Sequence, residues 1–143
     1  MRRVRIFKPQ RRGAPAMKAW IQAARALVEG GSEAVRRLPR ATEAQKAMLA
    51  KGAEEFAIAI ASGDIVKLRV FRGRRSTCAG CESMVYETAP GADGPSHWCG
   101  APLVDRIDER DRPTCGCLCI VKCVVASQKC PQRLWPEDQP GAR

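Results

Sequence analysis

The sequence predicts a small α+β protein, in which an N-terminal helical hairpin is followed by a cysteine-rich knuckle. The chain has 143 residues, enough for one hydrophobic core with at most a small satellite. Apolar residues recur at helical intervals in the first half of the chain. All eight cysteines lie in the second half, where they are expected to hold the short elements together.

The two halves also differ in charge. Residues 1–76 carry 18 Lys or Arg against 6 Asp or Glu, whereas residues 77–143 carry 7 against 9. The net charge of +10 therefore belongs to the first half. These shifts divide the chain into a flexible basic arm, a helical hairpin, a cysteine-rich domain and a tail, at residues 1–14, 15–64, 65–135 and 136–143.

The first helix is predicted to begin at Pro15 and to end at Gly30 and Gly31, because proline favours helix starts and glycine favours helix ends. Residues 32–38 are expected to add one short helical turn. The apolar positions recur every three or four residues and predict the face that meets the core. They are Met17, Trp20, Ile21, Ala24, Leu27 and Val28.

The second helix begins with a capping box, in which Thr42 and Gln45 satisfy each other's backbone donors. It is predicted to end at Gly63 and Asp64, and the short connection predicts antiparallel packing of the two helices. Its expected core face consists of Met48, Leu49, Ala53, Phe56, Ala57 and Ile60.

A strand is predicted over residues 65–72, where Val66, Leu68 and Val70 alternate with basic residues. The apolar run at 118–126 is a candidate partner for this strand. Loops are expected over 89–96, which is rich in Pro and Gly, and over the charged segment 105–112.

The sequence also predicts the compartment. Its longest strongly apolar stretch, residues 56–61, is far short of the roughly 20 residues that span a bilayer, so no membrane segment is expected. The N-terminal residues lack the apolar core and cleavage site of a secretory signal, which predicts a cytoplasmic protein. In a reducing cytoplasm, closely spaced cysteines bind metal more often than they form disulfides.

The cysteines have the spacing of a metal site. A C-x2-C pair lets two thiolates meet one ion, and structural zinc takes four such ligands in a tetrahedron. The preferred set is Cys78, Cys81, Cys117 and Cys130, with Cys115 and Cys99 as the next candidates. Zinc is the expected metal and an iron–sulfur cluster is the alternative, because four cysteines hold either. Buried unliganded thiols or disulfides are a further alternative.

The pattern C-x2-C followed by C-G-C-x4-K-x7-C-P-x3-W, over residues 75–135, resembles short cysteine-rich proteins of bacteriophage and bacterial genomes. The matching residues are Cys78, Cys81, Cys115, Gly116, Cys117, Lys122, Cys130, Pro131 and Trp135. The relatives carry another cysteine where this chain has Arg112, so Cys99 is a candidate for that role. The resemblance implies a zinc-ribbon-like knuckle and a component of a phage particle, in the host cytoplasm or in the virion.

Catalytic groups are scarce in the sequence. Neither a nucleophile with a base partner nor a phosphate-binding loop is recognisable, so we expect no enzyme and no small-molecule substrate. The only histidine, His97, is expected to be solvated and not a ligand. Trp135 is expected to cap the small core, while Lys122 either offsets thiolate charge or faces solvent. The carboxylates of residues 105–111 alternate with arginines, as in a charged loop.

Arginine clusters predict the partner. Guanidinium groups bind phosphate in a bidentate manner, which makes nucleic acid one candidate, and an acidic protein surface is the other. The candidate contacts are Arg2, Arg3, Arg5, Arg11, Arg12, Arg72, Arg74 and Arg75. The leading hypothesis is a metal-stabilised interaction module that binds protein subunits of a larger assembly. The alternatives are a nucleic-acid-binding zinc-ribbon protein and an iron–sulfur redox or sensor protein.

Overall fold

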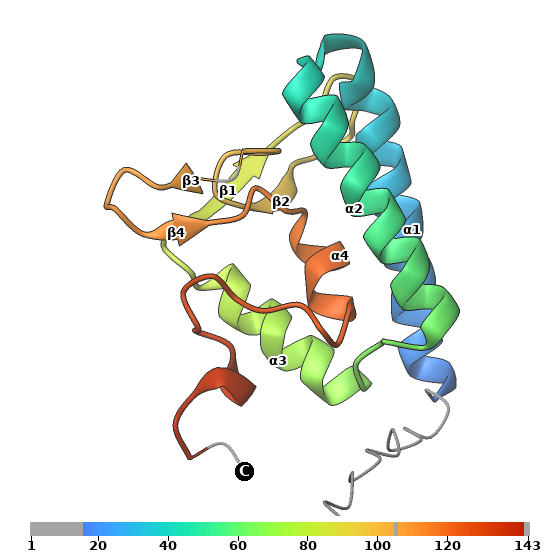
Figure 1. The fold of residues 1–143 in the computed structure, drawn as a ribbon, viewed down its shortest axis with the longest axis vertical. Coiled ribbons are helices and arrows are strands. Elements are labelled where there is room, and N and C mark those ends of the chain that lie inside the picture. Colours follow the sequence, from blue (N-terminus) through green and yellow to red (C-terminus); the bar gives the residue numbers. More distant parts are fainter. Residues whose placement is uncertain (1–15, 105, 142–143) are drawn as a thin grey trace, which may run out of the picture.

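Helices and two small antiparallel sheets form the part of the chain that is described, residues 16–104 and 106–141 of a computed structural model (Figure 1). The predicted arm over residues 1–14 lies outside these residues. The small α+β class is confirmed. The elements are α1 (Met17–Arg37), η1 (Leu38–Arg40), α2 (Glu43–Ser62), α3 (Leu68–Ala79), β1 (Met84–Glu87), β2 (Ser96–Cys99), β3 (Arg106–Ile107), β4 (Pro113–Thr114), α4 (Cys119–Val124) and η2 (Pro136–Asp138).

Helices α1 and α2 run antiparallel and are joined by η1 (Figure 1). The predicted capping box is confirmed: Gln45 N donates to Thr42 Oγ1 at 3.2 Å and Thr42 N donates to Gln45 Oε1 at 2.9 Å. The predicted end of α2 is also confirmed, because Gly63 closes the helix with a left-handed φ of 69°. Phe56 is buried on the predicted face, whereas Ala53 and Ala57 are exposed.

Helix α1 is longer than predicted, since it continues through Gly30 and Gly31 to Arg37. The predicted end at the two glycines is therefore wrong. Gly30 serves packing and does not end the helix. A Cβ at Gly30 would lie 3.0 Å from Cγ2 of Val121 in α4, so glycine lets the two helices approach closely.

The predicted core face of α1 is also wrong. The side chains that α1 buries are small or polar: Ala19, Ala23, Ala26 and Glu33. This face packs against α4, where the close approach of the helices favours small side chains. Of the six residues predicted to face the core, Trp20 packs partly against it and the others are exposed.

The predicted strand over residues 65–72 is a helix from Leu68 onward, so this prediction is also wrong. Phe71 and Arg74, three residues apart, lie on the buried face of α3. What remains of the strand is one antiparallel bridge between Ile65 and Val125. The alternation of apolar and basic residues was too short to distinguish a strand from a helix start.

The predicted partner of that strand, residues 118–126, forms the buried helix α4. In Figure 1, α4 lies between the long helices and α3, and it packs against both α1 and α3. The core cluster takes side chains from all four α-helices and from β2, and Trp98, Trp135 and Val124 are among its most buried members. Both halves of the sequence therefore share this core.

Strands β1 and β2 form a hairpin in which Val85 pairs with Trp98, and the predicted 89–96 loop connects them. An ion pair and a hydrogen bond fix this hairpin to α1, since Arg37 in α1 pairs with Glu87 in β1 at 2.7 Å. The buried Glu33 accepts hydrogen bonds from Ser96 Oγ at 2.5 Å and from Arg37 Nε at 2.9 Å. Among the described helices, none combines the length and the apolar character needed to cross a bilayer.

Within the charged segment that was predicted as a loop, residues 106–107 form strand β3, and residues 108–112 form the turn between β3 and β4. Asp108 organises this turn by accepting hydrogen bonds from the backbone N–H groups of Arg110 and Arg112, each at 2.9 Å. Its other oxygen accepts from Ser83 Oγ at 2.6 Å. The carboxylate is thus used within the turn, as the alternation with arginines predicted.

Candidate metal centre

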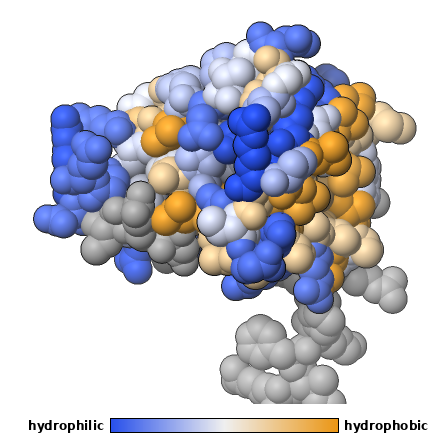
Figure 2. All heavy atoms as spheres, turned by 90° about the horizontal axis from the view of Figure 1, so that it is seen from above, coloured by the Kyte–Doolittle hydropathy of each residue, from blue (hydrophilic) through white to orange (hydrophobic). Residues whose placement is uncertain are grey.

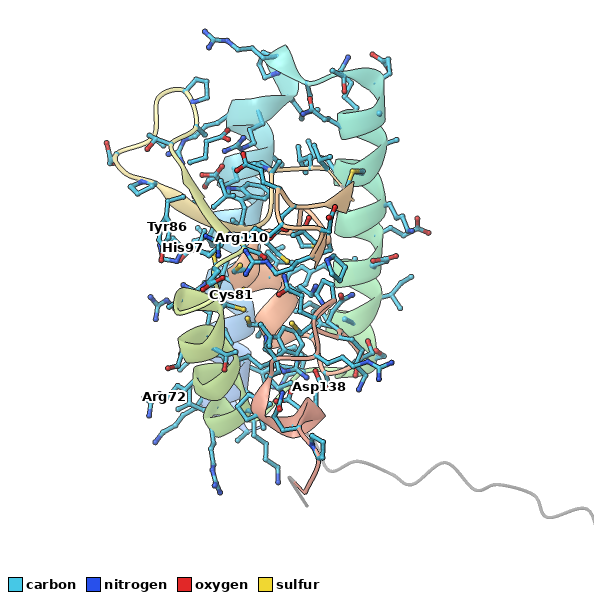
Figure 3. The ribbon with its side chains drawn as sticks, turned by 90° about the vertical axis from the view of Figure 1, so that its left-hand side faces the viewer. Arg72, Cys81, Tyr86, His97, Arg110 and Asp138 are labelled. Atoms are coloured by element: carbon cyan, nitrogen blue, oxygen red, sulfur yellow. The ribbon has the colours of Figure 1, made fainter. Side chains whose placement is uncertain are left out.

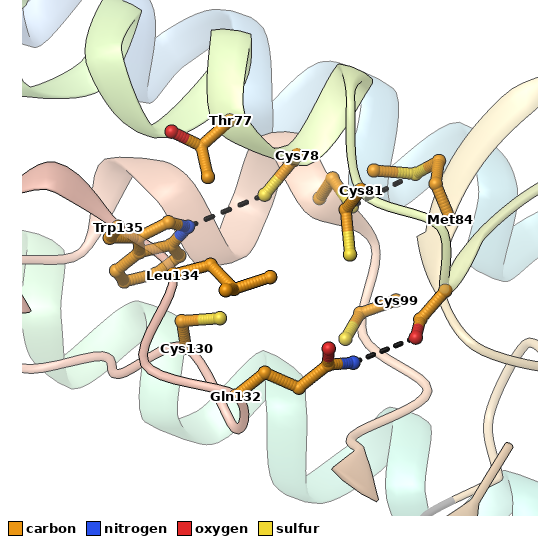
Figure 4. A pocket seen from close by; sticks show the side chains of 11 residues that line it. Thr77, Cys78, Cys81, Met84, Cys99, Cys130, Gln132, Leu134 and Trp135 are labelled. Atoms are coloured by element: carbon orange, nitrogen blue, oxygen red, sulfur yellow. Dashed lines mark hydrogen bonds between the residues drawn. The ribbon is translucent and has the colours of Figure 1, made fainter. Parts of the chain in front are cut away.

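Five cysteines line one small cavity of about 20 Å³ in the C-terminal half of the molecule. Cys78 comes from the end of α3, Cys81 follows that helix, and Cys99 ends β2. Cys130 reaches the cavity from the segment after α4, and Cys119 from the first turn of α4. Figure 4 shows that Cys78, Cys81, Cys99 and Cys130 surround a common space. The structure therefore brings together cysteines from separate segments.

The cavity contains three of the four preferred residues, Cys78, Cys81 and Cys130, and the next candidate Cys99. Cys117 is not among the lining residues. All eight cysteines lie in the described part of the chain and are free thiols. Across residues 16–104 and 106–141, no three His, Cys, Asp or Glu side chains are arranged to hold a metal ion.

Cys78 is the centre of a first group of thiols. Its Sγ lies 3.8 Å from Sγ of Cys123 and accepts a hydrogen bond from Trp135 Nε1 at 3.4 Å. Hydrogen bonds from the Cys119 and Cys123 thiols lower the pKa of Cys78, and Trp135 and the charge of Arg75 lower it further. Within this group the pKa of Cys78 is thus lowered by its neighbours, which favours the thiolate form that binds metal.

Cys115 is the centre of a second group. The Cys117 and Cys99 thiols donate hydrogen bonds that lower the pKa of Cys115, and Lys122 adds its charge. Lys122 Nζ donates to Cys115 Sγ at 2.9 Å. Burial alone would lower the pKa of Lys122, but the Cys115 thiolate outweighs burial and raises it. Lys122 thus offsets thiolate charge and does not face solvent.

The glycine of the C-G-C sequence, Gly116, is required for steric reasons. Gly116 adopts a left-handed φ of 64°, and a Cβ there would lie 2.4 Å from the backbone N of Val104. Its N–H donates to the Cys99 carbonyl at 2.8 Å, and Cys99 N–H donates to the Cys117 carbonyl at 3.0 Å. Only glycine lets these two segments approach so closely. The second cysteine group is therefore held by backbone geometry.

No protein family, curated protein or solved structure matches this chain. The resemblance to phage proteins accordingly stays a prediction that rests on the quoted residues.

Cys119 and Cys123 are the residues whose role the sequence did not predict. Both are buried, and they lie on successive turns of α4 with Cys78 close to each. The signal was their spacing, because residues four apart share one face of a helix. Met84 was also missed; its Sδ lies 3.6 Å from Cys119 Sγ.

Arg74 is not available to a partner, which corrects its prediction as a contact residue. Only 3% of it is exposed, and its guanidinium donates to the Val125 carbonyl at 2.8 Å. It also forms an ion pair with Glu137 and stacks 4.1 Å from the ring centre of Trp135. Trp135 is 1% exposed, which confirms that it caps the core.

The other predicted contact residues divide into two groups. Arg72 is exposed and points away from the molecule on α3 (Figure 3). Arg75 is half-buried, and its charge lowers the pKa of Cys78 in the first cysteine group. The remaining candidates lie outside the described residues: Arg2, Arg3, Arg5, Arg11 and Arg12.

His97 packs against Tyr86 in the β1–β2 hairpin. The two ring centres are 4.4 Å apart in an edge-to-face arrangement, and Figure 3 shows them together. Burial lowers the pKa of His97, and the charge of Arg75 adds to this effect. His97 is half-buried, not fully solvated, and is not among the residues that line the cysteine cavity.

Proposed function

We propose that the protein is a non-enzymatic interaction module whose C-terminal half is held together by one zinc ion. The ligands in this proposal are Cys78, Cys81, Cys99 and Cys130. The observation that carries it is their common position around one cavity, although they come from three separate segments. Four thiolates are the usual ligand set of a closed structural zinc site.

The surroundings of the cavity support this ligand set. Its neighbours lower the pKa of Cys78, and Trp135 Nε1 supports the Cys78 sulfur as an outer hydrogen bond donor. Lys122 already neutralises Cys115, the thiolate of the second group. In the proposed site the four thiols rotate toward the ion when it binds, since zinc binding and local folding are coupled.

Colour distinguishes zinc from the predicted alternative, because zinc bound by thiolates is colourless, whereas an iron–sulfur cluster, which four cysteines also hold, is brown. Purified protein is therefore expected to be colourless. A brown preparation with iron and acid-labile sulfide would instead support an iron–sulfur protein.

Metal analysis of single Cys→Ser variants tests the ligand set. We expect one zinc per wild-type chain and loss of zinc in Cys78→Ser, Cys81→Ser, Cys99→Ser and Cys130→Ser. Cys117→Ser is the matched control, because Cys117 is half-buried but does not line the cavity. Retention of zinc in all four variants, or its loss only in the control, would contradict the proposal.

Zinc release from the wild-type chain gives a second measurement that does not depend on variants that fold. A thiol-modifying reagent should release zinc together with modification of the cavity cysteines. Zinc that remains bound after those thiols have reacted would rule out this site. The expected setting in a phage particle stays a prediction from the sequence resemblance.

Nucleic-acid binding is the second candidate function, and the composition of α3 favours it. The helix carries four arginines and no acidic residue. Of these, Arg69 and Arg72 are exposed. Duplex DNA affinity that falls steeply with salt, and weakens in Arg72→Ala, would support this function. No binding at low salt would exclude it.

A further inference from the structure

Two cysteines from different helices lie close enough to become a disulfide. Sγ of Cys78, near the end of α3, lies 3.8 Å from Sγ of Cys123 in α4. The sulfurs of a disulfide are about 2.05 Å apart, so the two side chains need to bring them less than about 2 Å closer. The cysteines are 45 positions apart in the sequence, and the bond would join α3 covalently to α4.

The two thiols differ in their exposure. Cys123 is 0% exposed, because α4 lies between α3 and the long helices (Figure 1). Those long helices form the right-hand flank in Figure 2, where hydrophobic residues gather on the outside and close this side of α4. Cys78 is half-buried and lines the cavity of Figure 4. A small oxidant therefore reaches Cys78 first, and Cys123 is the second thiol within reach.

Cys123 has no part in the proposed zinc site. It is not among the residues that line the cavity, so it stays a free thiol when the four proposed ligands bind the ion. Cys119 also lies beside Cys78, but it lines the cavity and its thiol contacts Met84 Sδ at 3.6 Å. Cys123 is therefore the favoured partner of Cys78, and Cys119 is the competitor that the experiment has to exclude.

We propose that Cys78 and Cys123 form a redox pair, in which a peroxide converts the two thiols into a disulfide and thereby releases the zinc ion. The release of zinc rests on the proposed function, whereas formation of the bond rests on the positions of the two sulfurs. Reversible thiol sensors have the same arrangement, in which an accessible cysteine lies next to a second cysteine that resolves its oxidised form.

The chemistry takes two steps, written here for hydrogen peroxide. The Cys78 sulfur attacks one peroxide oxygen and the O–O bond breaks. Cys78 becomes a sulfenic acid, while the other oxygen takes a proton from solvent and leaves as water. The Cys123 sulfur then attacks the Cys78 sulfur, and the hydroxyl group leaves as a second water with the Cys123 proton. The two cysteines lose two electrons in total, and the peroxide accepts them.

Oxidation changes what holds the C-terminal half together. Without Cys78 the ion keeps three of its four ligands, and a closed structural zinc site requires four. The disulfide joins α3 to α4 in the zinc-free chain and protects Cys78 from further oxidation. Reduction of the bond restores the Cys78 thiol, so zinc binding is expected to be reversible.

Zinc release and peptide mass spectrometry of the full wild-type chain test the pair. Stoichiometric hydrogen peroxide should release zinc from the zinc-loaded protein, and a disulfide between the Cys78 and Cys123 peptides should appear. The same disulfide should form in the metal-free chain. Dithiothreitol should reduce the bond and restore zinc binding.

Cys123→Ala removes the second thiol without adding a polar group to the core. Peroxide is expected to oxidise Cys78 of this variant to the sulfinic acid, which dithiothreitol does not reduce, so zinc binding should not recover. Cys119→Ala is the matched control, because Cys119 is 1% exposed and lies on the same helix. It should form the Cys78–Cys123 disulfide and recover zinc as the wild type does.

The wild-type chain decides the outcome even if a variant fails to fold. A Cys78–Cys119 disulfide in place of the expected one would overturn the redox pair, as would zinc release that dithiothreitol does not reverse. Zinc binding without a Cys78–Cys123 disulfide after peroxide would also overturn the pair, while the zinc site would stand. A chain that binds no zinc but forms this disulfide would contradict the zinc site and its release, and would confirm the thiol pair.

Discussion

Helix α1 leaves most of its large apolar side chains exposed, whereas the cysteine-containing half of the molecule buries its largest ones. The largest fully buried side chains all come from the second half: Trp98, Trp135, Val124, Cys119 and Cys123. Most of the exposed large hydrophobic residues come from the first half: Met17, Ile21, Leu27, Val28, Val35, Leu38 and Ile58. The C-terminal half is therefore the centre of the core, and α1 covers it with alanines while most of its large apolar residues stay exposed.

Because the second half is the centre of the core, Arg74→Ala is expected to lower the free energy of unfolding more than any other substitution outside the cysteines. It removes hydrogen bonds to three backbone carbonyls and the stacking on Trp135, and it leaves Glu137 unpaired. We expect a loss of about 3–5 kcal/mol in the free energy of unfolding, measured with denaturant.

Arg72→Ala is the control for this prediction, since Arg72 is exposed on the same helix. It should change the free energy of unfolding by less than about 0.5 kcal/mol. Equal losses of unfolding free energy in Arg74→Ala and Arg72→Ala would contradict the expected difference between buried and exposed positions.

Gly116→Ala tests whether backbone packing holds the second cysteine group. The added Cβ would clash with the Val104 backbone, and the residue would keep an unfavourable positive φ. Together these effects should cost about 2–4 kcal/mol, which thermal and denaturant unfolding would both report.

Gly91→Ala separates the effect of the positive φ from the effect of the steric clash. Gly91 has a φ of 74° but open space where a Cβ would lie. We expect it to lose only about 1 kcal/mol from the unfavourable φ. If Gly116→Ala were no more damaging than this control, the close approach to Val104 would be unimportant.

Thr42→Ala should have the smallest effect of the three. It removes one side-chain acceptor from the start of α2 but leaves the core untouched, so a loss of about 1 kcal/mol is expected from chemical unfolding. Thr88→Ala, at an exposed position, should be nearly neutral. If Thr42→Ala lowered the free energy of unfolding as much as Arg74→Ala does, the start of α2 would contribute as much stability as the buried contacts of Arg74, which contradicts the expected order.

The elements that could be predicted from the sequence were those fixed by local signals. The bounds of α2 follow from the Thr42–Gln45 pair and from Gly63, whose roles depend on neighbouring residues alone. The buried face of α1 could not be predicted in this way. Its alanines are buried because α4 packs on them, and that contact joins segments about 90 residues apart.

The sequence predicted that cysteines form the candidate site, but it predicted only some of the cysteines that line the cavity. Three of the four preferred ligands, Cys78, Cys81 and Cys130, line one cavity, and metal binding there stays a prediction. The exchange of Cys117 for Cys99 depends on the β1–β2 hairpin, which brings the end of β2 to the cavity. The spacing of cysteines along the sequence does not predict a position that depends on how the hairpin folds.

The central claim is that a zinc ion bound by thiolates holds the C-terminal half together. The most direct test is elemental analysis of the purified, folded chain, before and after treatment with a chelator. We predict one zinc per chain, and removal of this zinc should abolish the near-ultraviolet signal of the buried Trp98 and Trp135. A chain that contains no metal and still unfolds cooperatively, with both tryptophans buried, would contradict the claim.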